Sequence, residues 1–266
     1  MLSILVKRIW LIGGTSESAN VAFSLVDILK EKDIICFITV TTEDAIKLYL
    51  KSSFIKVKVG KMTFEEMKLF CLEKGITNII DSSHPFAIEV SRNAIAVSQL
   101  LNIPYLRYER PNINDFKDNS NINTVSSFDE ILNSKYLENK KVLLTIGTRY
   151  LSLFKPWQEK SNLFVRILPN NEALKIALES GFTSNRIIAF RPPLNEDLEI
   201  ALWRHWQIDL VISKASGKAG GEDIKHKVSQ KLNIPLILIK RPSLDYPQIT
   251  HHISDILKFI TLSAMI

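Results

Sequence analysis

The sequence predicts an α/β protein with two Rossmann-like domains, mostly parallel sheets and an interdomain cleft. Runs rich in Ile, Val and Leu alternate with amphipathic helical patterns along the chain, which is typical of βαβ units. The length of 266 residues suits two domains of ordinary size. Residues 112–123 are rich in Asn and Asp, show no periodicity and are expected to link the two domains.

In the first half, strands and helices are expected to alternate from the start. The strands are predicted at residues 8–14, 34–40, 54–60, 76–81 and 103–111, and the helices at 16–32, 63–75 and 85–101. Alternating lysines favour an edge position for the third of these strands. Gly75 is expected to end the second helix, and Pro85 to take the first position of the third.

The second half repeats this pattern. Strands are expected at residues 140–148, 162–169, 186–190, 208–214 and 234–242, and helices at 127–139, 171–181, 195–207, 221–233 and 253–266. Both halves contain the same phrase, "LNIPYLRYERP" at 101–111 and "LNIPLILIKRP" at 232–242, which suggests an internal repeat. The last helix could pack on either domain.

Composition narrows the classes of function. A net charge of +6 is mild for this length, so it favours an anionic small molecule over nucleic acid. Cys36 and Cys71 lie in apolar surroundings and are expected to be buried thiols. No signal-peptide pattern and no apolar run of membrane-spanning length is present, so we expect a cytoplasmic protein that binds no membrane.

The first candidate segment is the turn after the first strand, formed by Gly13, Gly14, Thr15, Ser16 and Glu17. Glycines here let the backbone approach a ligand, and the following helix offers N–H groups to a phosphate. The match to G-x-G-x-x-G is poor, because Thr15 and Ser18 replace glycines, and a plain strand–helix turn is an equal alternative.

The residue type at the end of the second predicted strand helps to distinguish NAD-binding from NADP-binding proteins. Thr41 stands where an NAD-binding protein usually has an acidic residue. Hydroxyl groups without an acid favour NADP over NAD.

The second candidate segment is "DSSHPFA", with Ser82, Ser83, His84 and Pro85 at the end of another strand. A metal site would need further ligands nearby, and a hydrolase nucleophile would need G-x-S-x-G. The four polar side chains of Asp81, Ser82, Ser83 and His84 are more than a helix cap requires. We therefore expect this turn to lie at the ligand-binding edge of the sheet.

Cationic residues recur at predicted strand ends, which favours a ligand with several carboxylates. They are Arg107, Arg110, Arg149, Arg166, Arg191, Lys214, Lys240 and Arg241.

Several segments together resemble the precorrin-6A reductase family of cobalamin biosynthesis. They are "GGTSES", "DSSHPFAIEVSRNA", "PYLRYERP", "LLTIGTRYLSLF" and "ISKASGKAGGEDIKHKVSQKLNIPLILIKRP". They occur in the family's order from about residue 8 to residue 242.

The resemblance implies hydride transfer from NADPH or NADH to a double bond of a tetrapyrrole, with or without cobalt. It implies a cofactor domain at 1–115 and a domain at 116–266 that completes the substrate cleft. The glycine turn and the Ser82–Pro85 turn would line the cofactor. The residues facing the substrate would be Arg107, Arg110, Lys214, Ser216 and Gly217, and we add Arg149 from the cationic strand ends.

The proton donor stays open between Lys214, His84 and a water molecule. The family often has an arginine shortly after the glycine turn, and its absence at 18–20 leaves NADPH and NADH both possible. Two other functions remain. Tyr136 and Lys140 have the Tyr-x-x-x-Lys spacing of short-chain dehydrogenases, and a non-catalytic module binding a nucleotide or polyanion would use the same clefts.

Overall fold

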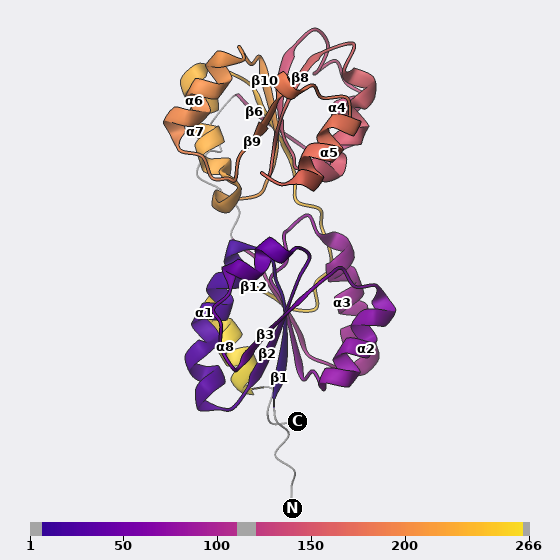
Figure 1. Cartoon of the computed structure of the whole chain (residues 1–266), viewed down its shortest axis with the longest axis vertical. Helices are drawn as coiled ribbons and strands as arrows, with labels where there is room; N and C mark the ends of the chain where they lie inside the picture. The colour runs from indigo at the N-terminus through magenta and orange to yellow at the C-terminus, as the bar shows by residue number, and fades with distance from the viewer. Residues whose placement is uncertain (1–6, 111–120, 263–266) are drawn as a thin grey trace, which may run out of the picture. The chain divides into compact units, whose positions relative to one another are not determined.

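The chain forms two compact units, each built on its own six-stranded sheet (Figure 1). The computed structural model describes residues 7–110 and 121–262. The first unit combines Met1–Pro111 with Pro242–Ile266, and the second spans Asn112–Arg241. The predicted α/β class with parallel sheets is confirmed.

All strand pairs of the first sheet are parallel, in the order β12-β5-β4-β1-β2-β3. The strands are β1 (Arg8–Ile12), β2 (Ile35–Val40), β3 (Ile55–Val59), β4 (Asn78–Asp81), β5 (Tyr105–Tyr108) and β12 (Ile249–Thr250). As its lysines predict, β3 lies at the edge. The carboxyl ends of β1, β4 and β5 lie side by side, and this juxtaposition positions the candidate site.

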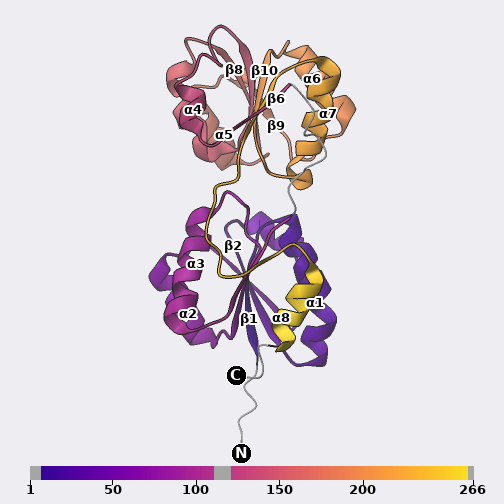
Figure 2. The ribbon, with the colours of Figure 1, turned by 180° about the vertical axis from the view of Figure 1, so that it is seen from behind.

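Helices cover both faces of this sheet, as Figures 1 and 2 show from opposite sides. One face carries α1 (Ser16–Glu31) and α8 (Ile253–Leu262), and the other carries α2 (Phe64–Lys74) and α3 (Ile88–Leu101). A short 3-10 helix, η1 (Glu43–Leu48), joins β2 to β3. The apolar stripe of each helix packs on the strands, as Leu25 of α1 and Val97 of α3 illustrate by their complete burial.

One predicted helix start is wrong. Pro85 does not begin α3 but lies in a turn closed by a hydrogen bond from the Ala87 N–H to the His84 carbonyl, 2.7 Å long. Proline suits the second position of such a turn as well as the first turn of a helix, so its fixed φ fits both. Gly75 ends α2 in the left-handed conformation, as predicted, with φ of 60°.

The second sheet is also parallel throughout, in the order β6-β11-β10-β7-β8-β9. Its strands are β6 (Ile122–Val125), β7 (Lys141–Thr145), β8 (Asn162–Ile167), β9 (Ile187–Ala189), β10 (Leu210–Lys214) and β11 (Leu236–Ile239). Helices α6 (Glu196–His205) and α7 (Glu222–Leu232) lie on one face. On the other lie α4 (Phe128–Leu132), α5 (Asn171–Glu179) and the 3-10 helix η2 (Thr148–Trp157).

Two expectations for this unit differ from the structure. The predicted linker 112–123 runs into strand β6, which begins at Ile122, while residues 112–120 lie outside the described part of the chain. The predicted helix 127–139 ends at Leu132, because the following residues form turns. Tyr136 and Lys140 therefore lie in a turn region rather than at a helix end.

The two sheets have equivalent strand orders, but the edge strands β12 and β6, which occupy equivalent places, come from different positions along the chain. β6 follows the first unit in sequence and pairs with β11, whereas β12 follows the second unit and pairs with β5. The predicted assignment of residues 116–266 to one domain is therefore wrong from Pro242 onwards. The internal repeat also appears in local geometry, since Asn102 and Asn233 both end their helices with φ of 53°.

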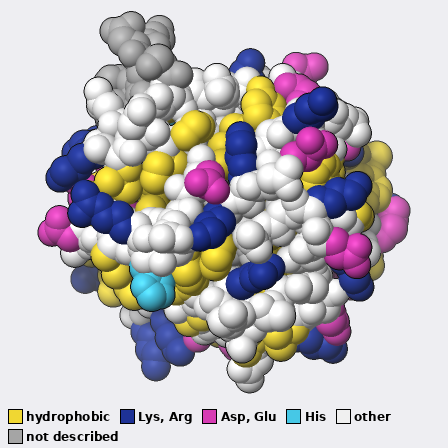
Figure 3. Space-filling model, turned by 90° about the horizontal axis from the view of Figure 1, so that it is seen from above, with side chains coloured by type: hydrophobic (Ala, Val, Ile, Leu, Met, Phe, Trp, Pro, Cys, Tyr) yellow, Lys and Arg dark blue, Asp and Glu magenta, His cyan; other side chains and the backbone are white. Residues whose placement is uncertain are grey.

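Other expectations from composition can be compared with the described residues. Both cysteines are buried and free, and burial raises the pKa of each thiol to about 12. Among the described helices, none has the length and apolar character needed to cross a membrane. The face drawn in Figure 3 carries lysine and arginine side chains at several places, interspersed with acidic ones.

Candidate functional site

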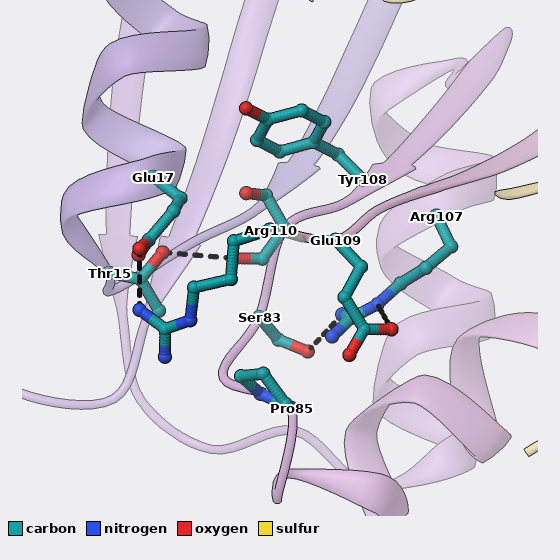
Figure 4. A pocket seen from close by; sticks show the side chains of 9 residues that line it. Thr15, Glu17, Ser83, Pro85, Arg107, Tyr108, Glu109 and Arg110 are labelled. Carbon is teal, nitrogen blue, oxygen red and sulfur yellow. Dashed lines mark hydrogen bonds and ion pairs between the residues drawn. The ribbon is translucent and has the colours of Figure 1, made fainter. Parts of the chain in front are cut away.

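The carboxyl ends of β1, β4 and β5 form a pocket in the first unit (Figure 4). Three segments that the sequence singled out meet there: the glycine turn, the "DSSHP" turn and the end of "LRYERP". The lining residues are Thr15, Glu17, Ser82, Ser83, Pro85, Arg107, Tyr108, Glu109 and Arg110. Parallel strands bring these segments together, because their carboxyl ends meet at one edge of the sheet.

Hydrogen bonds on both sides hold the glycine turn in place. The Gly13 N–H donates to the Thr39 carbonyl at 2.9 Å, and Gly14 adopts a φ of 96° that favours glycine. Thr15 caps α1, since its side chain accepts from the Ser18 N–H while the Ser18 hydroxyl accepts from the Thr15 N–H. The Thr15 hydroxyl also donates to the Ser82 carbonyl at 3.0 Å, which ties the two turns together.

Asp81 organises the second turn from beneath. Its fully buried carboxylate accepts hydrogen bonds from the Ser83 N–H at 2.9 Å, the Ser91 hydroxyl at 2.5 Å and the Tyr105 hydroxyl at 2.6 Å. The Arg107 guanidinium adds an ion pair at 2.9 Å. Burial opposes ionisation, but the Arg107 charge and the hydroxyl donors outweigh it and lower the pKa of Asp81. The carboxylate is therefore charged and fixes the turn.

Arg107 is buried, and its side chain contacts residues of the first unit. Its guanidinium donates to the Ser83 hydroxyl at 3.0 Å, lies 3.7 Å from the Glu109 carboxylate and stacks 5.2 Å above the Tyr246 ring. Although Arg107 lines the pocket, its charge is already matched by Asp81. The structure thus gives this predicted substrate residue a structural partner as well.

Two predicted residues with different expected roles form one ion pair. Glu17, expected on the cofactor side, pairs with Arg110, expected on the substrate side, at 2.5 Å (Figure 4). Both line the pocket. The edge of the pocket therefore carries both a negative and a positive side chain.

The remaining predicted cofactor residues lie close to these turns. Ser82 is buried, and its hydroxyl has no hydrogen-bond partner among the described residues. Gly13, Gly14, Ser16, His84 and Thr41 do not line this pocket. The His84 Nδ1 accepts from the Phe86 N–H at 3.2 Å, which stabilises the turn, and Thr41 is exposed directly after β2.

The other predicted substrate residues lie in the second unit, at the carboxyl ends of β7 and β10. Lys214 is partly buried, and a Cβ placed on Gly147 would lie 3.6 Å from its Nζ. Burial, followed by the nearby Arg149 charge, lowers the pKa of Lys214 to about 8. Arg149 itself is exposed, whereas Ser216 and Gly217 are buried. Lys214 is thus mostly protonated at pH 7 but close to its titration point.

The loop that follows Lys214 is held by α7. The Glu222 carboxylate accepts from the Gly217 N–H at 2.6 Å. The buried Lys225 donates to the Gly220 and Gly221 carbonyls at 2.7 and 3.1 Å. Burial, followed by the Arg166 charge, lowers the pKa of Lys225 to about 7.

Sequence reasoning missed several residues of these sites. Tyr49 bonds the glycine turn from a position 35 residues away that no motif marks. Lys225 bonds the second loop from α7, within the segment 212–242 that carries the resemblance, but the resemblance assigns its side chain no role. Tyr108 and Glu109 also line the pocket. They lie between Arg107 and Arg110 at the end of β5, so the strand-end position that singled out the two arginines could have identified them as well. In the described part of the chain, no three His, Cys, Asp or Glu side chains are grouped to hold a metal ion.

Comparisons with known proteins find relatives that match nearly the whole chain. A cobalt-precorrin-6A reductase of Synechocystis sp. is 43% identical over 251 residues, covering 94% of this chain and 95% of the relative. The cobalt-precorrin-6A reductase of Priestia megaterium is 31% identical over 242 residues, covering 90% of this chain and 92% of the relative. The solved structure of CobK precorrin-6A reductase, at 19% identity, matches over 97% of both chains with a TM-score of 0.77, which shows the shared fold.

The family match covers both units. Residues 8–261 match the family described as Precorrin-6x reductase CbiJ/CobK. The resemblance found in the sequence is therefore confirmed, and the chain belongs to the precorrin-6x reductase CbiJ/CobK family.

Proposed function

We propose that this protein reduces a ring double bond of cobalt-precorrin-6A by hydride transfer from a nicotinamide cofactor, as a step of cobalamin biosynthesis. The observation that carries the proposal is the family match over residues 8–261, which spans both units. The 43% identity to a cobalt-precorrin-6A reductase favours the cobalt form of the substrate. NADPH is the proposed cofactor, because Thr41 rather than an acidic residue follows β2.

We assign the binding of part of the nicotinamide cofactor to the pocket of the first unit. The buried Ser82 hydroxyl, which has no partner among the described residues, is a donor and acceptor for a ligand in this pocket. The same pocket holds Thr15 at the start of α1, where a helix favours a phosphate. We assign the cofactor to Thr15, Ser82, Ser83 and Pro85, with Gly13, Gly14, Ser16 and Glu17 shaping the turn beside it.

The second unit would bind the macrocycle by its rim carboxylates. Arg149 and Lys214 provide two cations at the ends of the neighbouring strands β7 and β10. The small residues Ser216 and Gly217 would let the macrocycle approach the loop after β10 closely. Arg107 contributes through the Asp81 turn rather than by direct contact.

Reduction of a double bond needs a hydride at one carbon and a proton at its neighbour. A dihydronicotinamide held by the first unit would supply the hydride, and Lys214 is our candidate for the proton. Its pKa of about 8 leaves an ammonium group at neutral pH that is more acidic than an ordinary lysine. His84, whose Nδ1 accepts from the Phe86 N–H, is the second candidate.

The test is a turnover assay with cobalt-loaded and metal-free precorrin-6A, each with NADPH and with NADH. We expect loss of the reduced-nicotinamide absorbance only when macrocycle is present, fastest with the cobalt form and NADPH. Absence of turnover in all four mixtures would reject the reductase proposal and leave a non-catalytic binding module. Tyr136→Phe is the control for a short-chain dehydrogenase mechanism, and it should keep full activity.

A further inference from the structure

We infer that Tyr49 is a positioning residue that sets the conformation of the glycine turn and thereby the affinity for the nicotinamide cofactor. Tyr49 directly follows η1, in the connection between β2 and β3, far from the turn in sequence. Its ring packs in the core between α1 and the sheet, and its hydroxyl reaches the turn. The inference rests on the proposed function, because it assigns the cofactor to the first unit.

The Tyr49 hydroxyl occupies a defined place in a closed set of hydrogen bonds. The Gly14 N–H donates to it at 2.7 Å, and the Ser18 hydroxyl lies 2.6 Å away. The Ser18 hydroxyl donates to the Thr15 carbonyl at 2.7 Å. The Tyr49 hydrogen is then left for the Ser18 oxygen, so every donor in the set has an acceptor. Burial raises the pKa of Tyr49, so the hydroxyl keeps that hydrogen.

The shape of the turn depends on the same oxygen. A Cβ placed on Gly13 would lie 2.3 Å from the Tyr49 hydroxyl oxygen and 3.1 Å from Ile38 Cγ2. Gly13 is therefore needed because Tyr49 fills the space above it. In the dinucleotide fingerprint the place of Ser18 is a third glycine, and here a serine fits because its hydroxyl bonds Tyr49.

The turn passes its geometry on to the pocket. Thr15, which is held by Ser18, lines the pocket and donates to the Ser82 carbonyl at 3.0 Å. Ser82 is the buried residue whose hydroxyl is available to a ligand. A looser glycine turn would thus displace Thr15 and Ser82 together, and it would weaken cofactor binding without touching Lys214, the first candidate for the proton.

The experiment measures NADPH binding to the full-length protein by nicotinamide fluorescence, without macrocycle. In Tyr49→Phe we expect the Kd for NADPH to rise about tenfold, because the Gly14 N–H loses a buried acceptor. At saturating NADPH, kcat and the KM for the macrocycle should stay within about twofold of wild type. Ser98→Ala removes another buried hydroxyl of this unit, bonded to the Ile95 carbonyl, and should leave the Kd unchanged.

A double mutant separates this role from a general loss of stability. Gly13→Ala alone should weaken NADPH binding strongly, since its Cβ meets the Tyr49 oxygen. Gly13→Ala combined with Tyr49→Phe should bind better than Gly13→Ala alone, because that oxygen is gone. Losses that simply add in the double mutant would overturn the inference.

Two further outcomes are informative. Tighter NADPH binding by Tyr49→Phe would mean that the hydroxyl competes with the cofactor for the Gly14 N–H, and it would reject the positioning role. If wild type itself binds neither NADPH nor NADH, the proposed function fails rather than Tyr49's role in it. Melting temperatures of all variants identify any that fails to fold. If Tyr49→Phe fails, Ser18→Ala replaces it, because it removes the hydroxyl that bonds both Tyr49 and Thr15, and it should weaken NADPH binding at least as much.

Discussion

At the scale of single residues, Lys214 combines a strand-end position with a pKa of about 8. The proposed macrocycle site therefore holds a lysine whose charge changes within the working range of an enzyme. Above pH 8 its ammonium form is lost, and with it both a cation for a carboxylate and a proton for the ring.

We predict that Lys214→Ala lowers kcat about 10²- to 10⁴-fold while the Kd for NADPH changes little. In wild type, kcat/KM for the macrocycle should decline above about pH 8, since the protonated form is the active one. Steady-state kinetics from pH 6 to about pH 9.5 measure this. Lys175→Ala, an exposed lysine of α5, is the matched control. Equal loss of turnover and NADPH binding would remove Lys214 from the substrate site.

Asp81 is the residue on which the "DSSHP" turn depends. Its lowered pKa means that the folded state favours the carboxylate, so this stability is present above the pKa of the unfolded state and is lost as pH falls through the folded pKa.

We predict that Asp81→Asn lowers the free energy of unfolding by about 3–5 kcal/mol, because it leaves the Arg107 charge buried without its main partner. Urea unfolding at pH 7 measures the change. Asp44→Asn breaks an exposed pair with Lys47 and should cost less than about 1 kcal/mol. A cost for Asp81→Asn no larger than this control would contradict the structural role.

At the scale of elements, α7 supports the loop that follows β10. Lys225 holds two loop carbonyls while its charge is buried near the Arg166–Glu199 ion pair. Its folded pKa of about 7 lies below the ordinary value of 10.5. Between these two values the unfolded chain binds more protons, so this lysine makes stability rise with pH from about 7 upwards.

We predict that Lys225→Met reduces the rise of unfolding free energy between about pH 7 and pH 8.5, compared with wild type. Urea unfolding at several pH values measures the slope. The same variant should raise the KM for the macrocycle and leave the KM for NADPH unchanged, because only the second unit's loop is loosened. Lys227→Met, on the exposed side of α7, is the control, and an identical slope in both variants would count against the buried charge.

At the scale of the whole molecule, the chain returns from the second unit to complete the first. β12 adds an edge strand beside β5, and α8 buries Ile256 and Ile260 in the core of the α1 face. Tyr246 of the returning segment stacks on Arg107. The proposed cofactor unit therefore depends on the segment that begins at Pro242 and carries β12 and α8.

We predict that Ile256→Ala lowers the stability of the first unit by about 2–5 kcal/mol, through lost burial and a cavity. Limited proteolysis should then cut the first unit sooner, and NADPH binding should fall at a lower temperature. Lys258→Ala, on the exposed side of α8, should behave like wild type. Preferential cleavage of the second unit instead would contradict the division of the chain.

Much of the fold could be predicted from the sequence, because burial leaves a local pattern. Runs such as those of β1 and β10 are apolar since both faces of a parallel strand are covered. The pocket segments could also be predicted locally, because glycines, serines or arginines directly follow the apolar strands there. The wrong start of α3 came from Pro85, whose preference does not distinguish a turn from a helix start.

The sequence alone determined the fold class, the family and the segments that meet at the strand ends. Only the tertiary structure decided that Arg107 pairs with Asp81, that Tyr49 bonds the glycine turn and that the last strand belongs to the first sheet. The physical reason is the separation in sequence over which each kind of interaction acts. Periodicity and turn chemistry act over a few residues, whereas these contacts join positions 26, 35 and 142 residues apart, which only the folded chain brings together.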